Sequence, residues 1–168
     1  AQQKGFDIIS EAMEEICALK VQMVVLGMGD IKYTQMFQEA AKRHPNIISF
    51  HSKFDDPLAH KIYAGADIFL MPSRYEPCGL GQLIALKYGT IPVVFNTGGL
   101  ADTVEPSTGF IFDSYSSTDL VKVVTTAVKT FSNKKKWYSL LLQAMKRDFS
   151  WDVSTGEYLK LYEKARLK

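Results

Sequence analysis

The 168-residue sequence is poor in cysteine and has no long hydrophobic run. Its two cysteines, Cys17 and Cys78, lack the paired spacing of a zinc site. Two free thiols are typical of a reducing compartment. No apolar run approaches the roughly 18 residues that cross a bilayer, and the N-terminus has no charged segment followed by an apolar signal core. We therefore expect a soluble cytoplasmic protein with no metal site and no membrane partner.

The sequence also lacks an excess of charge of either sign. It has 20 basic and 18 acidic residues, spread along the chain, for a net charge of +2. Such a balance gives no indication of a polyanion-binding face. The one basic cluster, Lys134 to Lys136, is more typical of a solvated helix start. We expect no nucleic-acid partner.

Helical and strand-like patterns alternate over the first hundred residues. Apolar side chains recur at helical spacing from Phe6 to Cys17, and a β-branched run over 21–26 then ends at Gly27. Three more such pairs follow: helices at 33–43, 57–64 and 80–88, with strands at 46–50, 67–71 and 91–95. Parallel strands joined by right-handed helical crossovers have this spacing. The predicted fold class is α/β, with a Rossmann-like doubly wound parallel sheet.

The alternation loosens after Gly99, and helices dominate the C-terminal part. One short strand is predicted at 109–112, and helices follow from Ser117, the last one over 154–167. Trp137 and Trp151 follow helical spacing, which favours core positions. We divide the chain into a Rossmann-like domain over residues 1–150 and a C-terminal helix over 151–168, which packs on its own domain or reaches to a partner domain.

Ligands of open α/β sheets bind beyond the carboxyl ends of the strands, so the loops there are the candidate sites. The first loop has Gly27 and Gly29, but Lys32 stands where a dinucleotide-binding G-x-G-x-x-G motif needs its third glycine. A redox dehydrogenase is therefore disfavoured. A tight turn explains at least one of these glycines, and a ligand passing close to bare backbone would also favour this loop.

The loop over residues 72–83 is the richest in candidate groups. Gly79 and Gly81 lie at the start of the next helix, where unpaired N–H groups and the helix dipole favour an anion such as a diphosphate. Glu76 stands just ahead of that helix, where its carboxylate can accept hydrogen bonds from sugar hydroxyls. Taken alone, a plain turn accounts for these glycines about as well.

A second glycine-bearing loop follows the next strand. Thr97, Gly98 and Gly99 form a stretch of accessible backbone that can bind an anion at the same edge of the sheet. Two such loops on adjacent strand ends point to a phosphate-bearing ligand.

Several motifs along the chain resemble a known family when taken together and in order. They are Gln3-Lys4-Gly5, Gly27-x-Gly29-Asp30, the stretches 60–67, 73–83, 88–94 and 97–104, Gly109-Phe110, Phe149-Ser150-Trp151 and the stretch 158–162. In this combination the sequence is similar to the C-terminal half of bacterial glycogen synthases and plant starch synthases. The resemblance covers nearly the whole chain, and Glu-Pro-Cys-Gly-Leu together with Thr-Gly-Gly-Leu is its most specific part.

The resemblance implies one half of a GT-B fold, in which two Rossmann-like domains face each other and the C-terminal one binds the donor. Such enzymes pass glucose from ADP-glucose or UDP-glucose to the 4-hydroxyl of an α-1,4-glucan, with retention of anomeric configuration. They need no metal or other cofactor. The glucan acceptor would bind through an N-terminal domain that is not part of this sequence.

The resemblance also implies roles for single residues near the leaving group. Lys4 would pair with the diphosphate, in the place where other transferases use a metal ion. Glu76 would hold the glucose hydroxyls, so Lys4 and Glu76 are the predicted catalytic residues. The backbone of Gly79, Leu80 and Gly81 would bind the distal phosphate.

Further donor contacts are implied around the sugar and the base. Gly98 and Gly99, following Thr97, would line the donor glucose. Cys78 fits a buried small residue beside the sugar better than a nucleophile, because no His or Asp lies near it in sequence. Phe54 falls where the family has an aromatic side chain beside the base, so we expect stacking there.

Three departures from the family bear on activity. The family's phosphate-binding arginine would precede Ala1, Gly81 stands where a threonine is frequent, and the acceptor domain is absent from the sequence. We therefore expect this chain alone to be inactive. Two alternatives stay open: a non-catalytic module that binds nucleotide sugars, and another retaining GT-B hexosyltransferase. The short link between Val104 and Gly109 favours a bacterial cytoplasm over a plastid.

Overall fold

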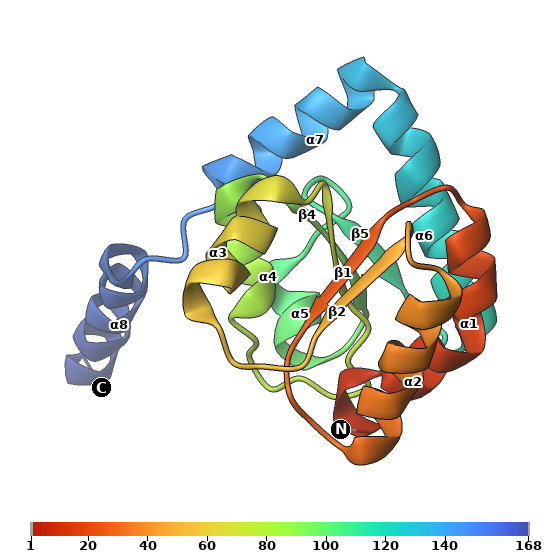
Figure 1. Cartoon of the computed structure of the whole chain (residues 1–168). Helices are drawn as coiled ribbons and strands as arrows, with labels where there is room; N and C mark the ends of the chain where they lie inside the picture. The colour runs from red at the N-terminus through yellow and green to blue at the C-terminus, as the bar shows by residue number, and fades with distance from the viewer. Residues whose placement is uncertain (1, 168) are drawn as a thin grey trace.

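A computed structural model describes residues 2–167 of the chain, which alternate between helices and short strands (Figure 1). The elements in chain order are η1 (Gln2–Lys4), α1 (Phe6–Ala18), β1 (Met23–Leu26), α2 (Ile31–Arg43), β2 (Ile48–His51), α3 (Asp56–Gly65), β3 (Ile68–Met71), α4 (Gly81–Tyr88), β4 (Ile91–Phe95), α5 (Gly98–Thr103), β5 (Phe110–Phe112), α6 (Ser117–Ser132), α7 (Lys134–Lys146) and α8 (Trp151–Arg166). All five predicted strands form. The loop predicted at Gly98 and Gly99 is instead the first turn of α5.

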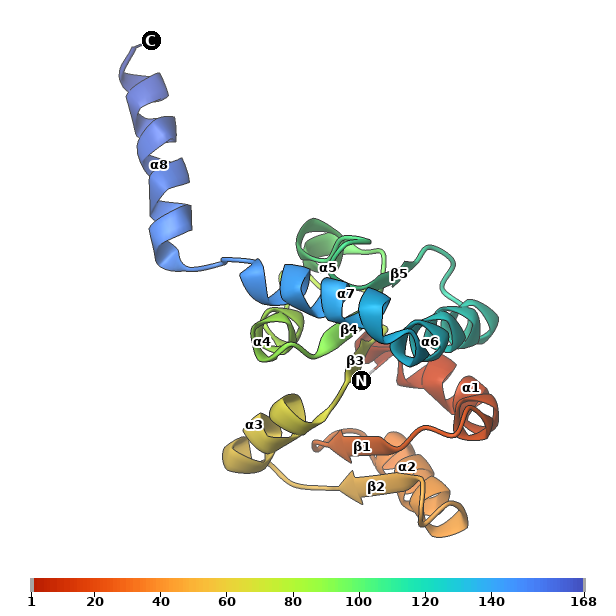
Figure 2. The same cartoon turned by 90° about the horizontal axis from the view of Figure 1, so that it is seen from above.

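The strands pair in parallel, in two hydrogen-bonded groups. β1 pairs with β2, with Met23 opposite Ile48. β4 lies between β3 and β5, with Ile91 opposite Ile68 and Val93 opposite Phe110. Side chains from all five strands pack in one core cluster, so the two groups belong to one layer. Seen from above, β2, β1, β3, β4 and β5 follow one another across this layer (Figure 2).

Helices cover both faces of the strand layer. On one face the largest core cluster joins α1, α2 and α6 to the strands and includes Val93 and Leu120. Val94 points to the opposite face, because side chains alternate along a strand. There it packs with Leu100 and Val104 beneath α5. The predicted Rossmann-like, doubly wound arrangement is confirmed.

The C-terminal helices differ in how they meet this core. Trp137 of α7 is buried and packs edge-on against Phe131, with ring centroids 5.2 Å apart. By contrast, α8 has no buried side chain among its described residues and projects from the domain (Figure 2). The predicted core position of Trp151 is wrong, since its side chain is 80% exposed at the start of that projecting helix. The division at residue 150 stays a prediction. No helix within residues 2–167 combines the length and apolarity needed to cross a bilayer.

Candidate functional site

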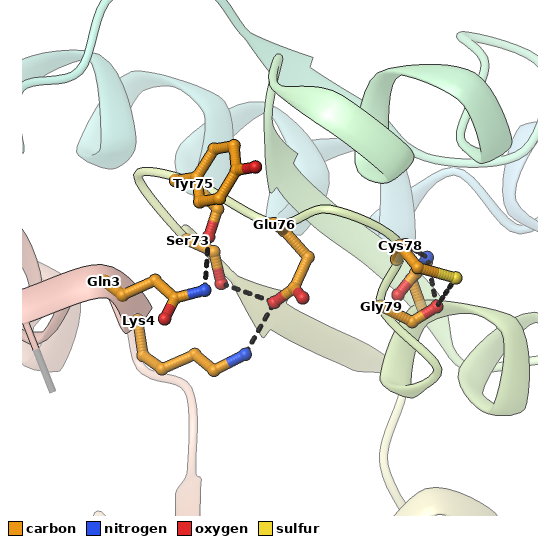
Figure 3. A network of polar contacts seen from close by, with 8 residues as sticks. Gln3, Lys4, Ser73, Tyr75, Glu76, Cys78 and Gly79 are labelled. Atoms are coloured by element: carbon orange, nitrogen blue, oxygen red, sulfur yellow. Dashed lines mark hydrogen bonds and ion pairs between the residues drawn. The ribbon is translucent and has the colours of Figure 1, made fainter.

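The N-terminal turn lies against the carboxyl end of β3. Gly5 adopts the left-handed conformation, with φ of 76°, and a Cβ atom at this position would overlap the carbonyl oxygen of Pro72. The backbone N–H of Arg74 donates to the carbonyl oxygen of Gln3 at 2.9 Å, and Gln3 Nε2 donates to the carbonyl oxygen of Tyr75 at 2.9 Å (Figure 3). These contacts fix η1 beside the loop that follows β3.

Lys4 and Glu76 meet at this junction as an ion pair. Lys4 Nζ lies 2.6 Å from Glu76 Oε2, and Ser73 Oγ donates to the same oxygen at 3.4 Å (Figure 3). The Glu76 side chain is 9% exposed and that of Lys4 is 46% exposed. A buried carboxylate is costly unless it is paired with a cation and hydrogen-bonded. Lys4 and Ser73 supply both kinds of partner, while almost half of the Lys4 side chain stays exposed.

Residues 97–99, the second glycine-bearing segment, pack directly on the backbone of residues 76–78 in the loop before α4. The N–H of Gly99 donates to the carbonyl oxygen of Glu76 at 2.9 Å. A Cβ atom on Gly98 would overlap that same oxygen, and one on Gly99 would overlap the backbone of Cys78. Residues 76–78 and 97–99 therefore lie in contact, and the absence of side chains at two consecutive positions makes that contact possible.

The side chains of Gln82 and Thr103 link the loop before α4 to the first turn of α5 by hydrogen bonds. Gln82 is fully buried, and its Nε2 lies 2.9 Å from the carbonyl oxygens of Cys78 and Gly79 and 3.2 Å from Thr103 Oγ1. Thr103 Oγ1 donates in turn to the carbonyl oxygen of Gly99 at 2.5 Å. Gln82 Oε1 is a buried acceptor without a hydrogen-bond partner among the described residues. The sequence analysis predicted no role for Gln82, Thr103 or Ser73. The one signal in the sequence was Gln82, a polar residue at an inward-facing position of a helix.

The remaining residues at the loop before α4 differ in exposure and in backbone conformation. Cys78 is exposed, so its predicted burial is wrong: its main chain faces Gly99, and its Sγ lies 3.7 Å from the carbonyl oxygen of Gly79. Leu80 is also exposed and is the residue just before α4. Gly79 has φ of +74°, and a Cβ on Gly81 would press on the Phe69 ring and on the Tyr63 hydroxyl oxygen. Packing within the fold thus accounts for part of the need for glycine at 81.

The other predicted donor residues lie at the ends of β1 and β2. The N–H of Gly27 donates to the carbonyl oxygen of His51 at 3.1 Å, which joins the loop after β1 to the last residue of β2. Both Gly27 and Gly29 have open space where a Cβ would stand. Phe54 is 89% exposed in the second of these loops. These residues share the carboxyl edge of the strand layer with Lys4 and Glu76, on the side of β1 and β2.

Two hollows on the surface lie apart from these residues. One, of about 550 Å³, is lined by residues of β5 and α6, and the other by residues around Lys136. Neither is lined by a predicted donor residue. Within residues 2–167 no group of three or more His, Cys, Asp or Glu side chains is placed to hold a metal ion.

Comparison with known proteins matches this chain to glycosyl transferases over most of its length. Residues 1–139 match the family model described as glycosyl transferases group 1. A glycogen synthase of Thermosipho africanus is 53% identical over 171 residues, which are 97% of this chain and 35% of that protein. A glycogen synthase of Fervidobacterium nodosum is 48% identical over 99% of this chain and 36% of that protein. The chain thus spans about a third of the length of the curated relatives that it matches.

A solved structure agrees with these relatives. The catalytic domain of starch synthase IV from Arabidopsis thaliana, bound to ADP and acarbose, superposes on the whole chain with a TM-score of 0.87 and 30% identity, and the chain covers 37% of it. The predicted resemblance to the C-terminal part of glycogen and starch synthases, and to one half of a GT-B fold, is confirmed. The chain belongs to the group 1 glycosyl transferases.

Proposed function

We propose that this chain is the donor-binding half of an α-1,4-glucan synthase, and that its donor is ADP-glucose or UDP-glucose. The observation that carries the proposal is the junction where Lys4, Glu76 and the two glycine segments meet at one edge of the strand layer. A cation, a carboxylate and accessible backbone in one place suit a ligand that joins a diphosphate to a sugar.

In this proposal Lys4 serves two partners at once. An ammonium group has three N–H donors, and Glu76 uses one of them. The exposed part of the Lys4 side chain leaves its other donors accessible to a diphosphate. The first N–H groups of α4, which begins at Gly81, have no partner within their helix. They add a second source of positive potential for the distal phosphate.

Glu76 has the geometry to recognise the sugar. Among the described residues, both donors to its carboxylate reach Oε2, so Oε1 is the atom we assign to the glucose hydroxyls. The Lys4 ion pair and the Ser73 hydroxyl hold the carboxylate in one orientation. Gly98 and Gly99 lie against its main chain and line the same side of the sugar.

The base of the nucleotide belongs, in this proposal, beyond β1 and β2. Phe54 presents an exposed ring there, and an aromatic ring over a base contributes about 1 kcal/mol beyond its buried area. Gly27 and Gly29 leave the backbone open to the ribose and phosphates. These assignments rest on the position of the loops at the carboxyl edge of the strands.

The reaction itself is assigned to the full-length protein. The relatives are named glycogen synthases, and the starch synthase structure holds ADP and acarbose. We propose glucosyl transfer to the 4-hydroxyl of a glucan with retention, in which Lys4 and the start of α4 stabilise the charge that develops on the departing diphosphate. The glucan binds outside this chain, which we expect to be inactive alone. No cofactor is needed, and a bacterial cytoplasm stays the predicted location.

Calorimetric titration with ADP, UDP and their glucose conjugates tests the proposal. We expect saturable binding of a nucleotide sugar, weakened about tenfold by Lys4→Met, because a charge-assisted contact is lost. Lys129→Met, which removes a cation from the last turn of α6, is the matched control and should bind as the parent chain does. If a chain that circular dichroism shows to be folded binds none of the four ligands, the donor site is refuted. Binding without transfer by the full-length protein would favour a non-catalytic module.

A further inference from the structure

The segment that carries Lys4 is anchored at its N-terminal end by the loop after β3. The carbonyl oxygen of Gln3 accepts the backbone N–H of Arg74 at 2.9 Å, and Gln3 Nε2 donates to the carbonyl oxygen of Tyr75 at 2.9 Å. Between this anchor and α1 the chain turns at Gly5, whose φ is 76°. A second anchor lies beyond the turn.

Tyr115 supplies this second anchor. Its hydroxyl donates to Asp7 Oδ1 at 2.7 Å, and Asp7 lies in the first turn of α1. The two residues are 108 positions apart, so the contact joins the start of α1 to the loop between β5 and α6. Residues 3–7 are thus fixed at both ends, with Lys4 between the two anchors.

Tyr115 is itself held by contacts that do not involve α1. Phe95, the last residue of β4, packs edge-on against the Tyr115 ring with centroids 5.2 Å apart, and the ring lies against the main core cluster. Ser116, the next residue, caps α6 by accepting the N–H of Asp119 at 3.2 Å. The core and the start of α6 therefore set the position of the hydroxyl that Asp7 meets.

Arg74 connects the two anchors. Its guanidinium carbon lies 5.2 Å from the centroid of the Tyr115 ring, a distance typical of a cation–π contact, while its backbone N–H binds Gln3. One residue of the loop after β3 thus reaches the first anchor through its main chain and the second through its side chain. Together with the chain between Gln3 and Asp7, these contacts form a closed ring that includes Lys4.

Burial and charge favour a persistent hydrogen bond at Tyr115. Burial, and after it the hydrogen bond to the Asp7 carboxylate, raise the pKa of Tyr115 above its ordinary value of 10.0. The hydroxyl therefore stays protonated, and remains a donor, at neutral and mildly alkaline pH. A hydrogen bond to an ionised carboxylate is about twice as strong as one between neutral groups.

We propose that Tyr115 is a positioning residue for Lys4. Its hydroxyl holds Asp7 at the start of α1, and its ring holds Arg74 in the loop after β3. The ammonium group ends a flexible four-carbon stem, so its direction toward Glu76 and the diphosphate depends on how firmly its backbone is held. The role of Tyr115 toward the diphosphate rests on the proposed function, whereas its role in fixing Lys4 does not.

Amide exchange in the ligand-free chain tests the anchoring of Lys4 without any assumption about the donor. The reporter is the N–H of Arg74, which is protected by its bond to Gln3. Tyr115→Phe keeps the ring and removes only the hydroxyl, and we expect it to speed exchange at Arg74 about tenfold while exchange in β4 stays unchanged. Tyr138→Phe, which removes the hydroxyl of an exposed side chain of α7, is the matched control and should exchange as the parent chain does.

Asp7→Ala removes the acceptor of the same hydrogen bond and gives a second reading. Exchange at Arg74 should speed as it does in Tyr115→Phe, and the two changes combined should add nothing further, because both remove one bond. Unchanged exchange at Arg74 in both single variants would overturn the proposal. So would equal acceleration in β4, because the hydroxyl would then stabilise the whole fold and not the segment of Lys4 in particular.

A double-mutant cycle on ADP affinity tests the effect on the ligand. Tyr115→Phe should weaken ADP binding about fivefold in the parent chain, because a charge-assisted hydrogen bond is lost. It should leave binding unchanged in the Lys4→Met chain, which has no ammonium group to position. An equal loss in both backgrounds would overturn the proposal. A folded parent chain that binds neither ADP nor its glucose conjugate refutes the proposed function instead, and exchange at Arg74 then decides whether Tyr115 positions Lys4.

Discussion

The carbonyl oxygen of Glu76 occupies the place that a Cβ atom would need on Gly98. The same oxygen accepts the N–H of Gly99 at 2.9 Å. The main chain of Glu76 is thus held against the first turn of α5, and its carboxylate is held by Lys4 and Ser73.

This contact predicts that alanine at position 98 destabilises the fold. Gly98→Ala must move backbone rather than a flexible side chain, and we expect the free energy of unfolding to fall by about 1–3 kcal/mol. Gly156→Ala, in α8, is the control: a Cβ there meets open space, and helix propensity alone predicts a gain of up to about 1 kcal/mol. Urea unfolding measures both. Equal stabilities of the two variants would show that the close approach is unimportant.

The hydrogen bonds of Gln82 predict a second effect on stability. Gln82→Leu removes the donor shared by Cys78, Gly79 and Thr103 and takes one hydrogen bond from each of two partly buried carbonyl oxygens. It also removes the unpartnered Oε1, so we expect a net loss of about 1–2 kcal/mol. The exposed Gln143→Leu should be close to neutral. A Gln82→Leu chain as stable as the Gln143→Leu chain would show that the hydrogen bonds of Gln82 do not stabilise the fold.

The start of α3 predicts a response to acid. Asp55 caps this helix through the N–H of Leu58, and its pKa lies below the ordinary value of 3.8 because of hydrogen bonds from Lys53 and then from Leu58. An acid with a lowered pKa stabilises the folded state above its ordinary pKa, and this contribution is lost as the pH falls through the lower, folded value. Carboxyl NMR should place the Asp55 midpoint below 3.8. A midpoint at or above 3.8 would contradict the cap geometry.

The exposure of α8 predicts that residues 1–150 fold without it. α8 has no buried side chain among its described residues, so removing residues 151–168 takes no apolar contact from the core. We expect the melting temperature of the shortened chain to match that of the whole chain. A clear decrease would mean that α8 packs on its own domain in solution, and the division at residue 150 would be wrong.

The sequence predicted the strands and helices well because their apolar periodicities are distinct. It also located the glycine loops, since ligand sites of parallel sheets follow the carboxyl ends of the strands. α5 was missed because glycines at its start favour a loop. Periodicity alone placed Trp151 in the core, although a periodic helix also needs a surface to pack against.

The details of the site depend on contacts between distant residues. Lys4 and Glu76 are 72 positions apart, and only the family resemblance brought them together before the structure did. Nothing in the local pattern could show that Gln82 would join Thr103, or that Cys78 would be exposed. Local sequence propensity cannot predict such pairings, because they depend on how the loops pack on one another.

Amide NMR mapping with ADP-glucose tests the central claim most directly. We predict that the largest saturable shifts fall on the N–H groups of residues 79–81 and 97–99, and that Glu76→Gln reduces those caused by the glucose conjugate more than those caused by ADP. Shifts gathered instead around the hollow between β5 and α6, with residues 79–81 and 97–99 unmoved, would contradict the account.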